Sequence, residues 1–368
     1  MGSDATTFAS LVQRTWRENV LFSVLVELTY RCNLDCAFCY NDLGLTGTAM
    51  STEEWIRFFE DLREMQVLNL TLSGGEPLAH PDFWRLGRRA RDLGFVVRVK
   101  SNGHALGAEA ARRLKEDVDP YMVEVSLHGG AAATHDRQTR VAGSFDRLLV
   151  HVRGMVAAGL RVRMNATLTR WNEDEVEGMF AIADGLGVRL QVDPEVTPRD
   201  DGDRSPLALS ASREGVSRLF RIEASRWAAK GAGPSEPEVG RQADALPAPD
   251  TGKHCGAGSS GIAVDPFGNV YPCVQWRRAA GNLHRSSIRE IWEQSPALAS
   301  VRGLSADVQA ALKPFGEDGP LFYFCPGTAE ALSGGNPLAV YEGARQRAAV
   351  LREILPGRKT VALRVLQE

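Results

Sequence analysis

Short apolar runs alternate with amphipathic stretches through the first half of the 368-residue chain. Apolar runs of roughly four to eight residues bounded by turn residues predict buried strands, and the amphipathic stretches between them predict helices. Strands that alternate with helices form a parallel sheet with helices outside, so the sequence predicts an α/β fold. The predicted strands are 20–29, 67–72, 96–100, 122–127, 162–168 and 188–192, and the helices that follow the second to fifth strands end near 93, 116, 158 and 186.

The helix after the first strand carries a start signal. Ser51 and Glu54 stand three residues apart, as in a capping box, where each side chain binds the other residue's backbone amide. The residues that follow are apolar on one side, as expected of a helix that covers a sheet. These apolar residues are Trp55, Phe58, Phe59 and Leu62.

The pattern changes after about residue 200. An amphipathic helix is predicted over 211–230, and residues 231–253 are rich in Pro, Gly and Ala, as in a flexible linker. We therefore expect two domains, divided in this linker. The predicted division is a lead-in at 1–19, a core at 20–200, a helix and linker at 201–253, a small domain at 254–335 and a helical tail at 336–368.

The small domain shows less regular patterning. Two short β-prone runs flank a Pro-Phe-Gly-Asn turn at 266–269, which predicts a hairpin over 262–273. Helices are predicted at 287–294 and at about 341–354.

The composition is that of an ordinary globular protein, with 43% apolar and 24% charged residues. A formal net charge of −3 favours neither nucleic acid nor an anionic membrane as a partner. Residues 1–19 lack the apolar centre of a signal peptide, and the apolar stretch 20–28 is too short to span a bilayer. We therefore expect a cytoplasmic protein, in which cysteines bind metal more often than they form disulfides.

Half of the six cysteines fall within eight residues, directly after the first predicted strand. Cys32, Cys36 and Cys39 form the pattern C-x3-C-x2-C, and thiolates this close together usually hold a metal. Three thiolates can hold three irons of a four-iron cubane and leave the fourth iron open to a ligand. Two alternatives remain: buried cysteines on one helix face, and a zinc site completed by a distant ligand.

This pattern, with the aromatic Phe38 before the last cysteine, resembles the signature of the radical S-adenosylmethionine (SAM) enzymes. The resemblance implies that the three cysteines hold a [4Fe–4S] cluster and that SAM binds its open iron. It also implies that an electron from the cluster cleaves SAM to methionine and a 5′-deoxyadenosyl radical, which abstracts a substrate hydrogen. The implied fold is a partial (β/α)6 TIM-like barrel with its chemistry at the C-terminal ends of the strands. Phe38 would pack near the adenine, and plain hydrophobic filling is its alternative.

The motif Gly74-Gly75-Glu76-Pro77 follows the second predicted strand. Two glycines let a ligand approach the backbone closely, and the acid can accept from an ammonium group. In the radical SAM family this motif holds the amino group of SAM. The alternative is a tight turn before a helix that begins at Pro77.

Polar residues at later strands resemble further SAM contacts of the family. Ser101 and Asn102 follow the third strand, Ser126 lies near the end of the fourth, and Asn165 lies on the fifth. The resemblance implies that such residues reach the ribose and the carboxylate of SAM. His128 departs from the family pattern, because Asp often follows Ser-Leu there. Ordinary turn chemistry at strand ends is the alternative for these positions.

The other three cysteines lie in the small domain, at Cys255, Cys273 and Cys325. With Gly268 they resemble the C-x9–15-G-x4-C, gap, C pattern of SPASM/Twitch extensions, which ligate auxiliary iron–sulfur clusters. Three cysteines suit one auxiliary cluster, expected to be [4Fe–4S], and the missing SPASM cysteine run favours a Twitch-like form. The fourth ligand is open, since Thr328 stands at the expected place and His254, a carboxylate, water or the substrate are candidates. Structural zinc and unligated cysteines are the alternatives.

Enzymes of this architecture often modify ribosomally made peptides by crosslinking, epimerisation or decarboxylation, and others oxidise small molecules such as aminocyclitols or porphyrin side chains. We expect an oxidative modification of such a peptide (crosslink, dehydrogenation or decarboxylation), with flavodoxin or ferredoxin as the electron donor. A small molecule is the alternative substrate. A non-catalytic iron–sulfur electron-transfer protein is the alternative of another class, but it would need no Gly-Gly-Glu-Pro loop.

Overall fold

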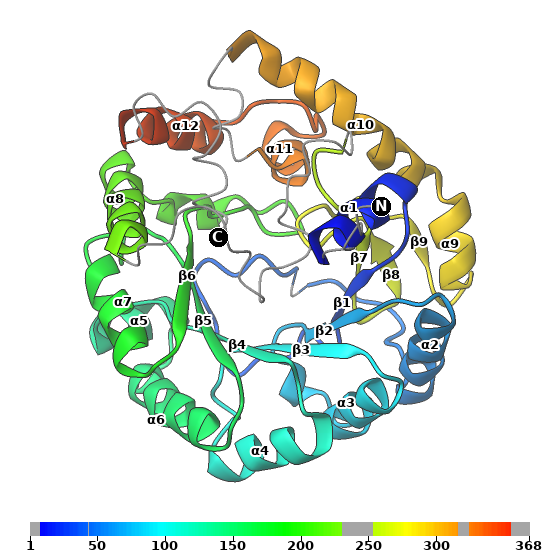
Figure 1. Ribbon diagram of the computed structural model, residues 1–368, viewed down its shortest axis with the longest axis horizontal. Coiled ribbons are helices and arrows are strands. Elements are labelled where there is room, and N and C mark those ends of the chain that lie inside the picture. The colour runs from blue at the N-terminus through cyan, green and yellow to red at the C-terminus, as the bar shows by residue number, and fades with distance from the viewer. Residues whose placement is uncertain (1–7, 43, 230–252, 316–323, 355–368) are drawn as a thin grey trace, which may run out of the picture.

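The structure is a computed structural model that describes residues 8–42, 44–229, 253–315 and 324–354. Within these residues a nine-stranded sheet has the order β6-β5-β4-β3-β2-β1-β7-β8-β9. Figure 1 shows the strands inside a ring of helices, and β1 to β6, which pair in parallel, curve into the open barrel that the resemblance implies. These strands are β1 (Ser23–Glu27), β2 (Asn69–Ser73), β3 (Val96–Ser101), β4 (Met122–Ser126), β5 (Val162–Thr167) and β6 (Arg189–Asp193).

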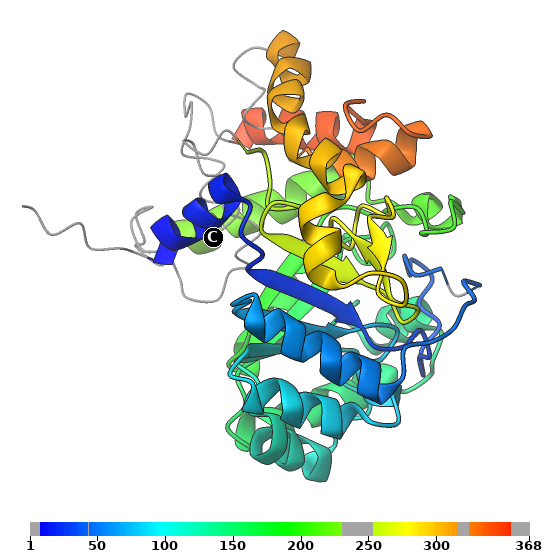
Figure 2. The ribbon, with the colours of Figure 1, turned by 90° about the vertical axis from the view of Figure 1, so that its right-hand side faces the viewer.

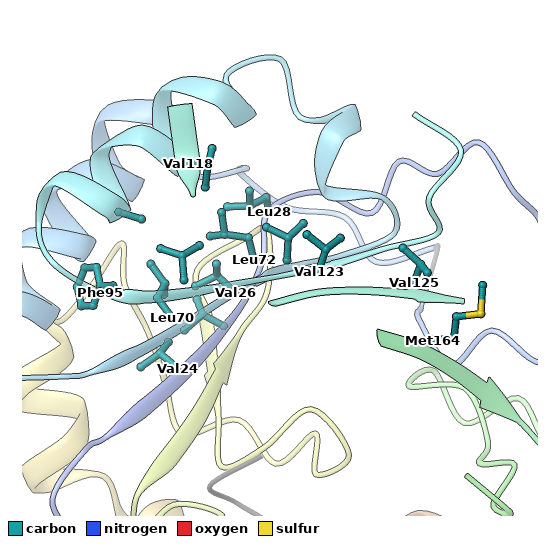
Figure 3. Packing of buried hydrophobic residues seen from close by; sticks show 14 of the residues in the cluster. Val24, Val26, Leu28, Leu70, Leu72, Phe95, Val118, Val123, Val125 and Met164 are labelled. Carbon is teal, nitrogen blue, oxygen red and sulfur yellow. The ribbon is translucent and has the colours of Figure 1, made fainter. Parts of the chain in front are cut away.

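The strands turn one face to the helices and the other to the barrel interior. Val24 on β1 lies opposite Leu70 on β2, and Val26 lies opposite Leu72. All four are buried in the core between the sheet and its helices, which Figure 3 shows from close by. Because side chains alternate along a strand, Glu27 faces the barrel interior instead.

Helices cover the outer face of the barrel, and the first of them begins as predicted. The Ser51 hydroxyl accepts from the Glu54 amide, and the Glu54 carboxylate accepts from the Ser51 amide at 2.7 Å. The predicted apolar side of this helix is buried. The helices of this part are α2 (Thr52–Glu64), α3 (Phe83–Asp92), α4 (Ala108–Arg113), α5 (Ala132–Thr139), α6 (Ser144–Ala157), α7 (Val176–Gly185) and α8 (Arg213–Ala229), with 3-10 helices at Pro77–Ala79 and Ser205–Leu209 and a π-helix at Leu114–Val118.

The segment predicted as a polar lead-in contains a helix, α1 (Phe8–Glu18). Its residues Val12 and Trp16 stand four apart, on one helix face, and are buried with Phe22. A helix of about three turns that buries so few apolar residues leaves a pattern too sparse to predict from sequence.

The C-terminal part continues the barrel sheet. β7 (Gly261–Val264) pairs in parallel with β1, and β8 (Asn269–Tyr271) and β9 (Gly281–Asn282) follow in antiparallel order. The predicted hairpin is therefore confirmed. The predicted linker lies, apart from residue 253, outside the described residues.

Four helices follow the hairpin; the first lies beside α2, and the other three lie above the barrel in Figure 2. The sequence predicts the first and the last of them but not the two between, and the last packs against α8. They are α9 (Ile288–Gln294), α10 (Pro296–Leu312), α11 (Pro326–Ser333) and α12 (Glu342–Ile354). Across the described part of the chain, the helices are too short or too polar to cross a membrane.

Candidate active site

The cysteine loop, residues 28–42 and 44–50, leaves β1 at the barrel edge where the parallel strands have their carboxyl ends. Barrel enzymes place their chemistry at this edge. Cys32 is exposed, and Cys36 and Cys39 are partly buried. Burial, together with the charges of the two other thiols, raises the pKa of Cys36 to about 12. A bound cation such as iron would offset this cost and hold the sulfurs as thiolates.

Two N–H groups point at the sulfur of Cys32. The Leu34 amide lies 3.4 Å away and the Asn102 side-chain nitrogen 3.6 Å away. Hydrogen bonds to sulfur help to set the potentials of iron–sulfur clusters. In the part of the chain that the structure describes, no three Cys, His, Asp or Glu side chains are arranged around one metal position. The loop remains compatible with a cubane, in which each cysteine binds a separate iron.

Gly74 and Gly75 are packed against the backbone of the cysteine loop. The Gly75 amide donates to the Thr29 carbonyl at 2.8 Å. An added Cβ would lie 2.3 Å from the Thr29 carbonyl oxygen at Gly74 and 2.6 Å from the Tyr30 carbonyl oxygen at Gly75. Gly74 also has a φ of 137°, which side chains rarely adopt. The close approach that requires glycine at these two positions is therefore made by the backbone of the cysteine loop, whereas the sequence predicts that a ligand makes it.

Substitution of Gly75 by Ala is expected to destabilise the fold by about 1–3 kcal/mol, because the added methyl group overlaps backbone atoms. Gly185→Ala is the matched control. Gly185 is the last residue of α7, and an added Cβ there meets nothing within 4 Å. In a helix Ala is favoured over Gly by about 0.5–1 kcal/mol. Chemical denaturation compares the two variants, and a Gly75→Ala protein as stable as the wild type would contradict the packing described.

Glu76 lies beside the cysteine loop, 1% exposed, with donors around its carboxylate. The Asn102 amide donates to one oxygen at 2.8 Å, the Leu78 amide to the other at 3.2 Å, and the Ser101 hydroxyl lies 2.9 and 3.0 Å from the two. These three donor hydrogens face about four lone pairs, so one lone pair remains for a further donor. Burial raises the pKa of Glu76 to about 7, although these hydrogen bonds act to lower it. A ligand ammonium at the remaining lone pair would favour the ionised carboxylate.

The predicted turn is present as well, because Glu76 caps the short 3-10 helix that begins at Pro77. Ser101 and Asn102 both bind the Glu76 carboxylate, and Asn102 also contacts the cysteine loop. The Asn102 side chain donates to Asn33 of the cysteine loop at 2.6 Å, while its amide binds Glu76. Their predicted direct contacts with SAM stay predictions.

Phe38 lies edge-on to the ring of His128, with 4.7 Å between the ring centroids. His128 is 6% exposed, and burial, with the charge of His135, lowers its pKa to about 3, so the ring is neutral. Its Nδ1 is buried without a hydrogen-bond partner among the described residues. Buried polar atoms in native proteins are nearly always paired. This nitrogen therefore fits a ligand that brings a hydroxyl or amino group, as the adenosine part of SAM does.

Ser126 and Asn165 lie opposite each other on β4 and β5. The Asn165 side-chain nitrogen donates to Glu124 at 2.9 Å, and its Oδ1 is buried without a partner in the described part of the chain. Glu124 pairs with Arg163 at 2.9 Å and with Lys100 at 3.8 Å. Burial alone would raise the pKa of Glu124, but these charges and the Asn165 hydrogen bond lower it to about 2.

This charged barrel interior is not among the features predicted from the sequence. Its signal is a charged residue between two apolar ones within a predicted strand, as at Arg98 and Glu124.

Backbone contacts bring the second cysteine group together. The Gly258 amide donates to the Pro272 carbonyl at 3.0 Å, so the stretch after Cys255 lies against the residue before Cys273. His254, a candidate fourth ligand, has its Nε2 2.6 Å from a backbone carbonyl, and that nitrogen is therefore already engaged.

The segment after Cys325 packs against the segment after Cys273. A Cβ on Gly327 would lie 2.4 Å from the Gln275 carbonyl oxygen. The Gln275 amide donates to the Cys273 sulfur at 3.2 Å, and the Thr328 amide to the Cys325 sulfur at 3.5 Å. These amide–sulfur contacts fit thiolates that hold a cluster. That the three cysteines hold one cluster stays a prediction.

Two family models match the chain. The model of the radical SAM superfamily matches residues 26–183, from the end of β1 into α7. The model of the SPASM iron–sulfur cluster-binding domain matches residues 255–313.

Relatives of known function extend over three quarters of the chain. PqqA peptide cyclase of Ruegeria pomeroyi is 31% identical over 297 residues, 76% of each chain. AdoMet-dependent heme synthase of Methanosarcina barkeri is 27% identical over 298 residues, 75% of this chain and 83% of the relative. Mycofactocin maturase MftC of Mycobacterium ulcerans is 29% identical over 287 residues, 75% of each chain.

Solved structures share the fold. SuiB of Streptococcus suis bound to its precursor peptide SuiA has a TM-score of 0.61 and 14% identity, over 80% of this chain and 70% of SuiB. The structure of anSMEcpe with bound AdoMet and Kp18Cys peptide has a TM-score of 0.60 and 18% identity, over 77% of this chain and 83% of that one. At these identities the likeness concerns the fold alone.

Fold and site together define a class of enzymes that use iron–sulfur clusters and SAM. The chain belongs to the radical SAM superfamily, and its C-terminal part carries a SPASM iron–sulfur cluster-binding domain. Its relatives are enzymes by name, so the alternative of a non-catalytic electron carrier is set aside.

Proposed function

We propose that this enzyme starts an oxidative modification of a ribosomally made peptide with a [4Fe–4S] cluster at Cys32, Cys36 and Cys39. When bound, the cluster would supply the electron that cleaves SAM to methionine and a 5′-deoxyadenosyl radical, which would abstract a hydrogen from the substrate. The observation that carries the proposal is the remaining lone pair of the buried Glu76, held beside the cysteine loop.

The residues around the cluster site would each have a defined task. Glu76 accepts a hydrogen bond from the SAM ammonium. Phe38 packs against the adenine, and His128 offers its neutral Nδ1 to the adenosine part. Asn165 offers Oδ1 from the barrel interior, one strand away from Ser126. Residues that hold SAM in a fixed orientation aim its reactive carbon at one substrate hydrogen.

A peptide substrate is supported by what the relatives are named for. One is a cyclase of the peptide PqqA and another is a maturase of mycofactocin, and each matches about three quarters of this chain. SuiB, which shares the fold, is seen with a precursor peptide. We extend this substrate class to the present enzyme, with flavodoxin or ferredoxin as the electron donor.

An oxidative outcome is supported by the use of the cysteines. The chain has six: three in the cysteine loop, two within the SPASM match and Cys325 beyond that match. If Cys255, Cys273 and Cys325 hold one auxiliary cluster, no thiol is left to return a hydrogen atom to a substrate radical. Crosslinking, dehydrogenation or oxidative decarboxylation then follows more readily than epimerisation.

Product mass tests this proposal. The reconstituted enzyme is incubated in deuterated water with SAM, dithionite and a synthetic copy of any short peptide encoded beside its gene. A product lighter by two hydrogens, or by carbon dioxide together with two hydrogens, is expected, and the Cys32→Ala protein should give none. A product of unchanged composition that carries one carbon-bound deuterium would contradict the oxidative outcome and show that a cysteine is free.

A small molecule is the second candidate substrate. The heme synthase relative favours it, because that enzyme matches 75% of this chain. This candidate would be supported if the enzyme converted a porphyrin with propionate side chains and did not modify the peptide.

A further inference from the structure

A buried ion-pair network joins β1 to the SPASM domain. Glu27, the last residue of β1, is 0% exposed, and Arg277 donates to both of its carboxylate oxygens at 2.9 Å. Arg277 also pairs at 2.9 Å with Asp200, whose amide donates to the Tyr40 carbonyl at 2.8 Å. A guanidinium that binds both carboxylate oxygens fixes orientation as well as distance.

Glu27 also anchors both ends of the three-cysteine motif. The Tyr30 hydroxyl lies 3.2 Å from one of its oxygens, and the Tyr40 hydroxyl lies 3.3 Å from the other. Tyr30 stands two residues before Cys32, and Tyr40 follows Cys39 directly. The two contacts therefore bracket the cysteines.

Arg277 lies close in the chain to Cys273 of the second cysteine group. It stands four residues after Cys273, and its guanidinium lies 5.0 Å from the ring centroid of Tyr271. The Tyr271 hydroxyl in turn donates to Asp265, at the turn of the hairpin, at 3.1 Å. One side chain thus connects the SPASM hairpin to the anchor of the cysteine loop.

We propose that Arg277 is a positioning residue that holds residues 30–40 of the cysteine loop in their binding geometry. Without the guanidinium, Glu27 and Asp200 would be two buried carboxylates that lack their cation, which is a strongly unfavourable state. Repulsion between them would then displace the Glu27 carboxylate, which is the acceptor for both tyrosine hydroxyls. The consequence for SAM binding rests on the proposed function, but the effect on the loop does not.

The end of the cysteine loop has its own attachment to the SPASM domain. The Met50 amide donates to the Pro266 carbonyl at 2.8 Å, and the His284 Nε2 lies 2.9 Å from the Thr48 carbonyl. Neither contact involves Arg277. Loss of Arg277 should therefore loosen residues 30–40 and leave 48–50 in place.

Hydrogen exchange of the protein without iron tests the effect on the loop. In Arg277→Met, amides of residues 30–40 should exchange about tenfold faster or more, because local opening becomes easier there. Arg278→Met is the matched control, since Arg278 pairs with Glu330 of α11, in the C-terminal part of the chain and away from the cysteine loop. It should leave the exchange of residues 30–40 unchanged.

The reconstituted protein tests the consequence for SAM. SAM binding should weaken about tenfold in Arg277→Met if only about one molecule in ten keeps the competent loop. The electron paramagnetic resonance signal that SAM induces in the reduced first cluster should change as well. Arg277→Lys keeps the charge without the two-pronged geometry, so it should restore these properties only in part.

A further variant covers the case in which Arg277→Met does not fold. Glu27→Gln keeps the shape and removes the charge that Arg277 binds, so it should speed exchange of the same residues. The double variant should be no worse than the worse single one, because both act through one contact. Unchanged exchange in Arg277→Met and Glu27→Gln, or an equal effect of Arg278→Met, would overturn the inference. Failure of the wild type to cleave SAM would instead overturn the proposed function. The exchange data would still test whether Arg277 positions residues 30–40.

Discussion

Replacement of Cys32, Cys36 and Cys39 together by Ala is expected to remove about half of the bound iron and all SAM cleavage. Anaerobic reconstitution of the wild type should give roughly eight irons per chain if both sites carry four-iron clusters. The variant would keep only the SPASM cluster, which has no reason to bind SAM. Iron analysis, visible absorption and the yield of 5′-deoxyadenosine measure the three quantities.

The control for this prediction is the complementary variant. Cys255→Ala with Cys273→Ala should remove the other half of the iron and leave some SAM cleavage, because the cysteine loop and Glu76 are unchanged. A protein that contains zinc alone, without charge-transfer absorption, would contradict both the prediction and the proposed function. Loss of all iron from either variant would mean that the two sites do not load independently.

Substitution of Glu76 by Gln is expected to weaken SAM binding about ten- to a hundredfold at pH 8, equal to about 1.5–3 kcal/mol for one charge-assisted hydrogen bond. The wild-type affinity should also depend on pH. The pKa of Glu76 in the ligand-free site is about 7, so below this pH the carboxyl is mostly protonated and an ammonium must displace the proton. Wild-type affinity should thus fall from pH 8 to pH 6, and the Glu76→Gln affinity should stay flat.

The pH profile separates a contact with SAM from a structural role. Gln also leaves one of the backbone amides around Glu76 without its acceptor, so some loss of stability is expected in any case. Glu54→Gln serves as the control, because Glu54 closes the capping box of α2 and lies outside the site. It should lower stability slightly and leave SAM affinity unchanged. Equal SAM affinity in the wild type and Glu76→Gln would remove Glu76 from the proposed site.

The glycines of the Gly-Gly-Glu-Pro loop illustrate how far local pattern carries. Their position after a strand is visible in the sequence, and so is the need for a close approach to the backbone. What approaches is the backbone of Thr29 and Tyr30, about 45 residues earlier in the chain. The glycines and the residues that approach them are too far apart in the chain for local pattern to connect them, so the sequence predicts a ligand as the close neighbour.

The helices show the same limit in another form. Where a helix carries a cap and a full apolar side, as α2 does, its sequence predicts it. Where it buries only a few residues, as α1 does with Val12 and Trp16, tertiary contacts decide. Packing of a sparse apolar face stabilises a helix only once the partner surface exists.

The sequence by itself determined the alternation of strands and helices and the C-x3-C-x2-C motif, because each is encoded by residues close together in the chain. The open barrel and the second cysteine group were expected from the resemblance to the radical SAM enzymes. Only the tertiary structure decided how these parts meet. It placed the hairpin of the SPASM domain on β1, and it paired Glu27 with Arg277 across 250 residues. A buried carboxylate in a strand predicts that some cation must pair with it, but which one depends on a contact between distant segments that form only when the chain is folded.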